Sequence, residues 1–158
     1  MGWIASERLP RFLFPCLLIV LFGCSSNPPK NPEEHARFER IVGAVESLRK
    51  AYVEKDEAAV EELLLPLERL ERLEKEIRKD FSTFSMISLN LFIERINITG
   101  DLITVSIRWQ GKWRRSPEEI GVEGRGHGIL LWSGTQVILL TGLEGDLPFG
   151  MATRRAMS

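Results

Sequence analysis

The sequence contains very little of three residue types that often carry chemistry. It has two cysteines, two histidines and one tyrosine in 158 residues, and both cysteines, Cys16 and Cys24, lie near the start of the chain. The residues after Cys24 therefore cannot form a disulfide or supply a thiol nucleophile. An excess of positive charge is lacking as well, because 21 basic residues face 22 acidic ones. This balance excludes the concentrated basic surface of a nucleic-acid-binding protein.

Long apolar runs are also scarce, and the clearest one lies near the N-terminus. It covers residues 12–22, follows Arg8 and Arg11, and is interrupted by Pro15. A membrane-spanning helix needs about 20 apolar residues, so a transmembrane anchor is the weaker interpretation. A buried core helix is disfavoured by the polar, proline-bearing segment 25–30 that follows. A cationic start, a short apolar stretch and a small residue at its end are typical of a secretory signal.

The end of this run resembles the bacterial lipoprotein box. It reads Leu21-Phe22-Gly23-Cys24, with Phe22 bulkier than the usual residue at its position. The resemblance implies cleavage between Gly23 and Cys24 and a diacylglycerol on the Cys24 sulfur, which would anchor the chain to a membrane. Ser25 resembles the signal for outer-membrane delivery in a Gram-negative cell, so we expect the chain to face the periplasm if the host is of that type.

The expected organisation is a signal peptide (1–23), a lipidated cysteine with a flexible tether (24–31), one domain (32–150) and a disordered tail (151–158). Apolar residues at three- and four-residue spacing predict a first helix over about 32–54, with Asn31 as its N-cap. Asp56 is the expected N-cap of a shorter helix, which ends at Pro66. A third helix, over about 67–81, has an apolar stripe on one side. On its other side each acidic residue lies four positions before a basic one.

Beyond the helices the apolar period changes to two, which predicts strands. A long strand over about 87–98 changes phase near Glu94, which indicates a β-bulge. A turn at 99–101 leads to a strand over 103–109, a loop over 110–119, and strands over about 120–132 and 136–143. The layout predicts an α+β domain with three helices on one face of a curved four-stranded antiparallel sheet. The other face of this sheet must also be covered, either because the sheet curls into a cone or because a second subunit docks on it.

The order of these elements resembles the nuclear transport factor 2-like domains. The resemblance rests on the end of the first helix (51–59), on the Gly100-Asp101 hairpin and on the closing segment 145–150; the last strand departs from the family pattern in placing Gln136 before Val137-Ile138. It implies a curved sheet around a cone-shaped pocket and, often, a dimer through the outer sheet face. Members include isomerases, dehydratases, transport adaptors and domains without known activity, so the fold alone constrains function poorly.

Three side chains are candidates for chemistry in such a pocket. Glu94 lies within a strand at the change of phase, although an exposed bulge residue beside Arg95 is the simpler interpretation. His127 lies in a glycine-rich run that lacks the strand-then-helix context of a phosphate-binding loop, and glycines here favour sharp bending instead. Tyr52 ends the first helix and is more typical of a core residue. No residue has a partner at metal-ligand spacing, and we expect neither metal nor cofactor.

The tryptophans offer a second kind of candidate. Trp109 and Trp132 can line an apolar pocket, although a plain core role explains both. Trp113 falls in the predicted loop, where we expect it to be exposed and, with Arg114 and Arg115, able to contact anionic headgroups or a partner.

The sequence thus favours a membrane-anchored, non-catalytic envelope module that binds a protein or a small apolar ligand. A pocket enzyme of isomerase or dehydratase type and a lipid carrier are the alternatives. A buried acid–base pair would favour the enzyme, a pocket filled by the domain's own side chains would remove it, and a continuous apolar cavity would favour the carrier.

Overall fold

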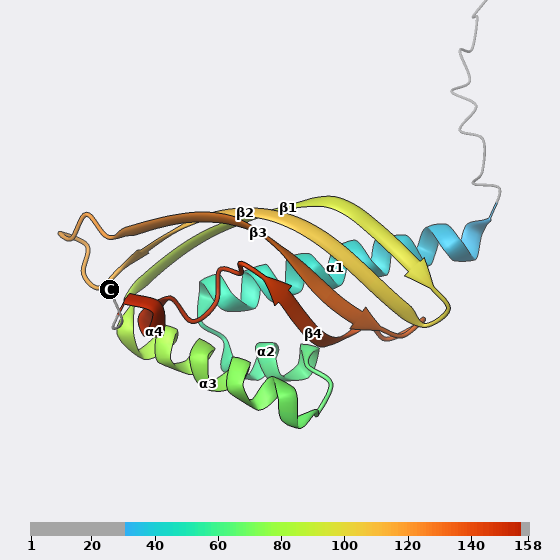
Figure 1. Ribbon diagram of the computed structural model, residues 1–158, viewed down its shortest axis with the longest axis horizontal. Coiled ribbons are helices and arrows are strands. Elements are labelled where there is room, and N and C mark those ends of the chain that lie inside the picture. The colour runs from blue at the N-terminus through green and yellow to red at the C-terminus, as the bar shows by residue number, and fades with distance from the viewer. Residues whose placement is uncertain (1–30, 156–158) are drawn as a thin grey trace, which may run out of the picture.

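The computed structural model describes residues 31–155, and the predicted signal peptide, Gly23, Cys24 and most of the tether lie outside this range. Four helices and four strands follow one another in the described chain (Figure 1). They are α1 Pro32–Glu54, α2 Glu57–Leu63, α3 Glu68–Thr83, β1 Met86–Thr99, β2 Leu102–Arg114, β3 Val122–Ser133, β4 Leu139–Gly145 and α4 Met151–Arg155.

The first two helices form where the sequence predicts them, although one cap differs. The Asn31 side chain makes no cap bond to the backbone and instead donates to Glu34 Oε2 at 2.7 Å. Lys55 ends α1 in the left-handed region, at φ 59°. The Asp56 carboxylate then accepts from the Ala59 N–H at 3.0 Å and caps α2 as expected.

The strands pair in the order β1-β2-β3-β4, and every pair is antiparallel. The register of β1 against β2 shifts between Ile93 and Arg95, which confirms the bulge predicted at Glu94. The predicted loop over 110–119 is wrong in its first half, because β2 continues to Arg114 and pairs with both neighbours there. The connection between β2 and β3 is correspondingly short.

The C-terminal segment also differs from the prediction of a disordered tail over 151–158. Residues Met151–Arg155 form α4, and the side chains of Met151 and Ala152 are buried. This helix packs against α3, as Figure 1 shows. Five residues are too few to predict a helix from periodicity, so its stability must come from tertiary contacts.

The helices cover one face of the sheet, and the sheet arches over them (Figure 1). Alternate strand residues point into this layer and form one core with the apolar stripes of α1 and α3. The predicted α+β architecture, with helices on one face of a curved four-stranded antiparallel sheet, is confirmed. Within residues 31–155, no helix combines the length and the apolar character needed to cross a bilayer.

Candidate functional site

The space between helices and sheet is occupied by large aromatic side chains. Trp109, Trp113 and Trp132 come from the sheet and Tyr52 from α1, and each is at most 2% exposed. The rings of Trp109 and Trp113 meet edge to face, with centroids 6.1 Å apart. Tyr52 meets Phe149 in the same way at 5.0 Å. The core role that the sequence suggested for Tyr52, Trp109 and Trp132 agrees with these positions.

Two of the indoles approach the backbone of the sheet closely because glycines face them there. A Cβ on Gly111 would lie 2.6 Å from Trp113 Cη2, and a Cβ on Gly124 would lie 3.2 Å from Trp109 Cη2. A larger residue at Gly111 would also meet the Ser88 carbonyl oxygen at 2.9 Å. The glycines in these strands therefore make room for a tryptophan core, which is the close approach of side chain to backbone that strand glycines often mark.

A buried polar network lies at one end of this core and centres on Asp80, the last-turn aspartate of α3. Its carboxylate is fully buried and accepts from the Tyr52 hydroxyl, the Gly150 N–H and the Ala152 N–H, each at 2.7 Å. The Tyr52 oxygen in turn accepts from Trp113 Nε1 at 3.0 Å. Hydrogen bonds from several donors are the usual way in which a buried carboxylate is stabilised.

Burial and the neighbouring Asp80 carboxylate raise the pKa of Tyr52 well above its ordinary value, burial being the larger cause. The phenol is therefore a neutral hydrogen-bond donor over the physiological range. The hydroxyl keeps its proton and donates it in a hydrogen bond to Asp80 Oδ2 at 2.7 Å, and the Pro148 carbonyl oxygen is 3.2 Å from the same hydroxyl. Asp80 and Tyr52 are an acid–base pair by distance, but both side chains are fully buried and Asp80 already accepts from two backbone N–H groups.

The C-terminal segment closes this end of the core. Trp109 Nε1 donates to the Asp146 carbonyl oxygen at 2.8 Å, and Leu147, Phe149 and Met151 are buried over it. The two N–H groups that hold Asp80 belong to the same segment. The network thus fastens the chain end across the core, and no substrate can reach the Asp80–Tyr52 pair in this arrangement.

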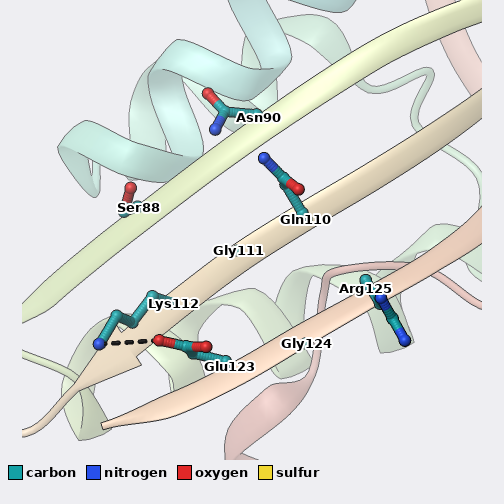
Figure 2. Close-up of a pocket in the computed structure, with 8 residues that line it drawn as sticks. All are labelled: Ser88, Asn90, Gln110, Gly111, Lys112, Glu123, Gly124 and Arg125. Carbon is teal, nitrogen blue, oxygen red and sulfur yellow. Dashed lines mark hydrogen bonds and ion pairs between the residues drawn. The ribbon is translucent and has the colours of Figure 1, made fainter. Parts of the chain in front are cut away.

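A hollow of about 710 Å³ opens instead on the outer face of the sheet, which points away from the helices (Figure 2). Polar side chains line it in rows across three strands, and Gly111 and Gly124 contribute only backbone. Lys112 and Glu123 point toward each other at 2.9 Å. The other lining side chains are Ser88, Asn90, Gln110 and Arg125, and among residues 31–155 no hydrogen bond or ion pair occupies them. We call this hollow the outer groove.

The structure brings together two sequence candidates, Glu94 and His127, but on the outer face. Their Oε1 and Nε2 atoms are 3.6 Å apart, and Arg108 Nε lies 3.7 Å from the same carboxylate oxygen. All three side chains are substantially exposed, and Arg108 also stacks over the ring of Phe92 at 4.6 Å. Glu94 is therefore an exposed residue at the bulge, as the simpler interpretation of the sequence predicts. Its partners, however, are Arg108 and His127 instead of Arg95.

The prediction of an exposed Trp113 is wrong. Trp113 lies near the end of β2 with no exposed surface, because its indole fills the place that Gly111 leaves open. Arg114 is half-buried and donates to the Pro117 carbonyl oxygen at 3.4 Å, while Arg115 is exposed. Trp113 therefore cannot take part in a membrane or partner contact in this conformation.

Asp80 is the residue that the sequence analysis missed. It follows Ile77 by three residues and precedes Phe81, so it lies on the apolar stripe of α3. A carboxylate on a buried stripe is a visible signal, but the many charged residues of the same helix hide it. Glu94, which stood out because of its strand, is exposed.

The comparisons with known proteins identify the fold. No protein-family model matches the chain, and no curated protein matches it by sequence. Solved structures do. A nuclear transport factor 2-like superfamily protein from Salmonella enterica serovar Typhimurium is 11% identical, with a TM-score of 0.61, over 75% of this chain and 96% of its own.

Two further structures align similarly. A candidate dehydratase of the nuclear transport factor 2-like family, from Streptomyces avermitilis, is 12% identical with a TM-score of 0.61, over 72% of this chain and 99% of its own. A conserved protein from Planctomyces limnophilus is 15% identical with a TM-score of 0.59, over 68% of this chain and 95% of its own. At these identities the likeness establishes a shared fold and no shared activity.

Proposed function

We propose that this chain, which has the nuclear transport factor 2-like fold, is a lipid-anchored bacterial envelope protein whose domain is a non-catalytic interaction module. The anchoring part is supported by the lipoprotein-box sequence that ends at Cys24. The non-catalytic part is carried by one observation: indole and phenol side chains occupy the interior, and the domain's own N–H and O–H groups occupy Asp80. An isomerase, a dehydratase or a lipid carrier would need that space open.

The outer face of the sheet is the contact surface in this proposal. Basic side chains outnumber acidic ones on this face. The basic residues are Arg95, Arg108, Lys112, Arg114 and Arg125, and the acidic residues are Glu94, Glu123 and Glu144. The helical layer carries the opposite balance, since acidic residues outnumber basic ones between Pro32 and Thr83. Arg125 lies across from Gln110 in the β2–β3 register, and among residues 31–155 neither its guanidinium nor the amides of Asn90 and Gln110 have a side-chain partner. Charge complementarity therefore favours a partner protein with an acidic, hydrogen-bonding surface.

A photo-crosslinking amino acid in place of Gln110, introduced in living bacteria, tests this surface. We expect a covalent adduct with another envelope protein, weakened by Arg125→Glu in the same chain. The first control places the crosslinker at Arg72, which is exposed on α3. The second control keeps the crosslinker at position 110 and replaces Arg125→Glu by Lys75→Glu, a charge reversal on the exposed side of α3. Equal adducts from positions 110 and 72, or an adduct insensitive to Arg125→Glu, would contradict the assignment.

An adduct of twice the chain mass would instead show a homodimer through this face, which the resemblance to the family predicts. Ile129 and Leu131 are half-buried apolar residues on the same face and favour such a contact. Sedimentation of the fragment 31–158, which carries the whole described core, would then show a dimer at high micromolar concentration.

Binding of a small apolar ligand is the second candidate function, and a different feature favours it. A hollow of about 340 Å³ lies between α1 and the edge strand β1, lined by Val42, Val45, Leu91, Phe92 and Ile93 with Glu46. If this cleft holds a ligand, mass spectrometry of the natively purified domain should detect a bound apolar compound, and Val45→Trp should remove it.

A further inference from the structure

The end of the molecule at which α1 begins exposes several large apolar side chains. Phe38 is 43% exposed on the second turn of α1, and Leu102 is 65% exposed at the start of β2. Ile98, near the end of β1, and Val137, just before β4, are 41% and 69% exposed. We call these four side chains, with the segments that carry them, the apolar tip. Single exposed apolar residues are ordinary, but four at one end of a domain call for an explanation.

Arginines of α1 hold the segments of the apolar tip together. Arg37 donates to the carbonyl oxygens of Gly100 at 2.8 Å and Gly134 at 2.9 Å, and so joins the β1–β2 and β3–β4 turns. Arg40 donates to the Thr135 carbonyl oxygen at 2.9 Å. The Gly134 N–H also donates to the Asp101 carbonyl oxygen at 3.0 Å. The start of α1 and both hairpin turns therefore form one end of the molecule, as Figure 1 shows.

The position of this end relative to the proposed anchor identifies what covers it. If Cys24 is acylated, residues 25–31 join the lipid to the first residue of α1. Seven residues reach at most about 25 Å when fully extended. From the first residue of α1, the 23 residues of this helix extend about 35 Å toward the end of the molecule that carries the β2–β3 loop and α4. The apolar tip is thus the part of the domain that the tether holds beside the bilayer.

The charges at the apolar tip indicate whether it would contact the bilayer through electrostatic attraction or through apolar side chains. Glu33, Glu34 and Asp101 lie there with Arg37 and Arg40, whose guanidinium groups are engaged by carbonyl oxygens. Among the described residues of the tip, three carboxylates against two guanidinium groups leave no net positive charge to attract anionic headgroups. Contact must therefore come from apolar side chains that enter the boundary between headgroups and acyl chains, as for other interfacial segments.

We propose that the apolar tip lies against the membrane, with Phe38, Ile98, Leu102 and Val137 in the headgroup–acyl boundary. This inference rests on the proposed lipidation of Cys24. It orients the domain with α1 leading away from the bilayer and leaves the outer groove, which lies toward the opposite end of β2, clear of the lipid.

A single introduced cysteine tests the orientation, because the processed chain would carry no other free thiol: Cys16 would be removed and Cys24 acylated. The full chain with Val137→Cys, purified from membranes and reconstituted in phosphatidylcholine vesicles, is labelled with an environment-sensitive fluorophore. Leu102→Cys repeats the test on the β1–β2 hairpin. The control is Ile120→Cys, which is 86% exposed in the β2–β3 loop at the far end of the molecule. Phospholipids with a spin label on the acyl chain then report contact by quenching.

We expect blue-shifted emission and several-fold stronger quenching at positions 137 and 102 than at 120, unchanged by added salt. Equal, weak quenching at all three positions in vesicle-bound protein would overturn the docked tip while leaving the anchor intact. A blue shift without quenching would place another protein copy on the tip and would also overturn it. Labelling of the unsubstituted chain at Cys16 or Cys24 would instead show an unprocessed N-terminus and refute the proposed lipidation.

Discussion

At the scale of single residues, Asp80 has the largest structural consequence. One carboxylate, in the last turn of α3, receives two N–H groups of the C-terminal segment and the hydroxyl of Tyr52. Burying a carboxylate without such donors would cost a large amount of free energy. Asp80 can therefore be buried only while the C-terminal segment and Tyr52 donate to it. In other proteins an Asp–Tyr pair at this distance can transfer protons, but here it fastens the chain end.

The substitution Asp80→Asn should destabilise the domain by about 2–3 kcal/mol. The amide keeps the shape of the side chain, but its NH₂ group must face one of the three donors that the carboxylate accepts. Urea unfolding of the 31–158 fragment measures the loss. Asp101→Asn, an exposed aspartate in the β1–β2 turn, is the control and should change the free energy of unfolding by less than about 0.5 kcal/mol. Equal stability of the two variants would contradict the network.

Tyr52 is the only tyrosine of the chain, so its ionisation can be followed alone by tyrosinate absorbance. The pKa of Tyr52 is raised in the folded state, whereas in the unfolded chain it is about 10. Below about pH 10 the phenol is therefore neutral in both states, and just above this pH it ionises only in the unfolded chain. Its contribution to stability is therefore complete below pH 10 and declines at higher pH, by up to about 1.4 kcal/mol per pH unit. Tyrosinate should appear only on unfolding. An absorbance change near pH 10 in the folded protein would show an accessible phenol.

At the scale of elements, the sequence predicted the regular parts and missed those that depend on distant contacts. Helix α1, the cap at Asp56 and the bulge at Glu94 follow from local patterns and were predicted. The predicted loop over 110–119 contains Trp113, whereas in the structure the inward-facing positions 109, 111 and 113 of β2 carry tryptophan, glycine and tryptophan. Helix α4 is too short to show a periodic signal, and the bonds that hold its start run from Gly150 and Ala152 to Asp80, which lies 70 and 72 positions earlier.

A pair of glycine substitutions tests the packing of β2. Gly111→Ala should cost about 1–3 kcal/mol, because its Cβ would meet both the Trp113 indole and the Ser88 backbone. Gly43→Ala, on α1, should stabilise by about 0.5–1 kcal/mol, because its Cβ has no neighbour within 4 Å and alanine favours the helix. Both are measured by urea unfolding. If Gly111→Ala were also neutral or stabilising, the indole could not lie where it does.

At the scale of the whole molecule, the two ends and two faces have different surroundings. The proposed anchor and the apolar tip place one end at the bilayer, the C-terminal segment closes the other end of the core, and the outer groove faces away from the helices. The fold was predictable because it depends on the order of elements. The filled interior was not, since it depends on which indoles lie over which glycines. The outer groove was likewise hidden, because its lining comes from three strands that only the register brings together.

The proposed membrane attachment concerns the whole chain and should depend on one sulfur. The variant Cys24→Ser removes the acceptor of the lipid and should move the protein out of the membrane fraction, whereas Ser26→Ala, two residues away, should not. Immunoblots of fractionated cells measure both. If Cys24→Ser stayed in the membrane, the N-terminus would be an uncleaved anchor.

The mass of the intact protein purified from bacterial membranes tests the account most directly. We predict a chain that begins at Cys24 and carries the added mass of a diacylglycerol on that residue, with the N-terminal segment 1–23 absent. A full-length chain without acyl mass would contradict the lipid anchor, and with it the envelope role and the membrane-facing apolar tip.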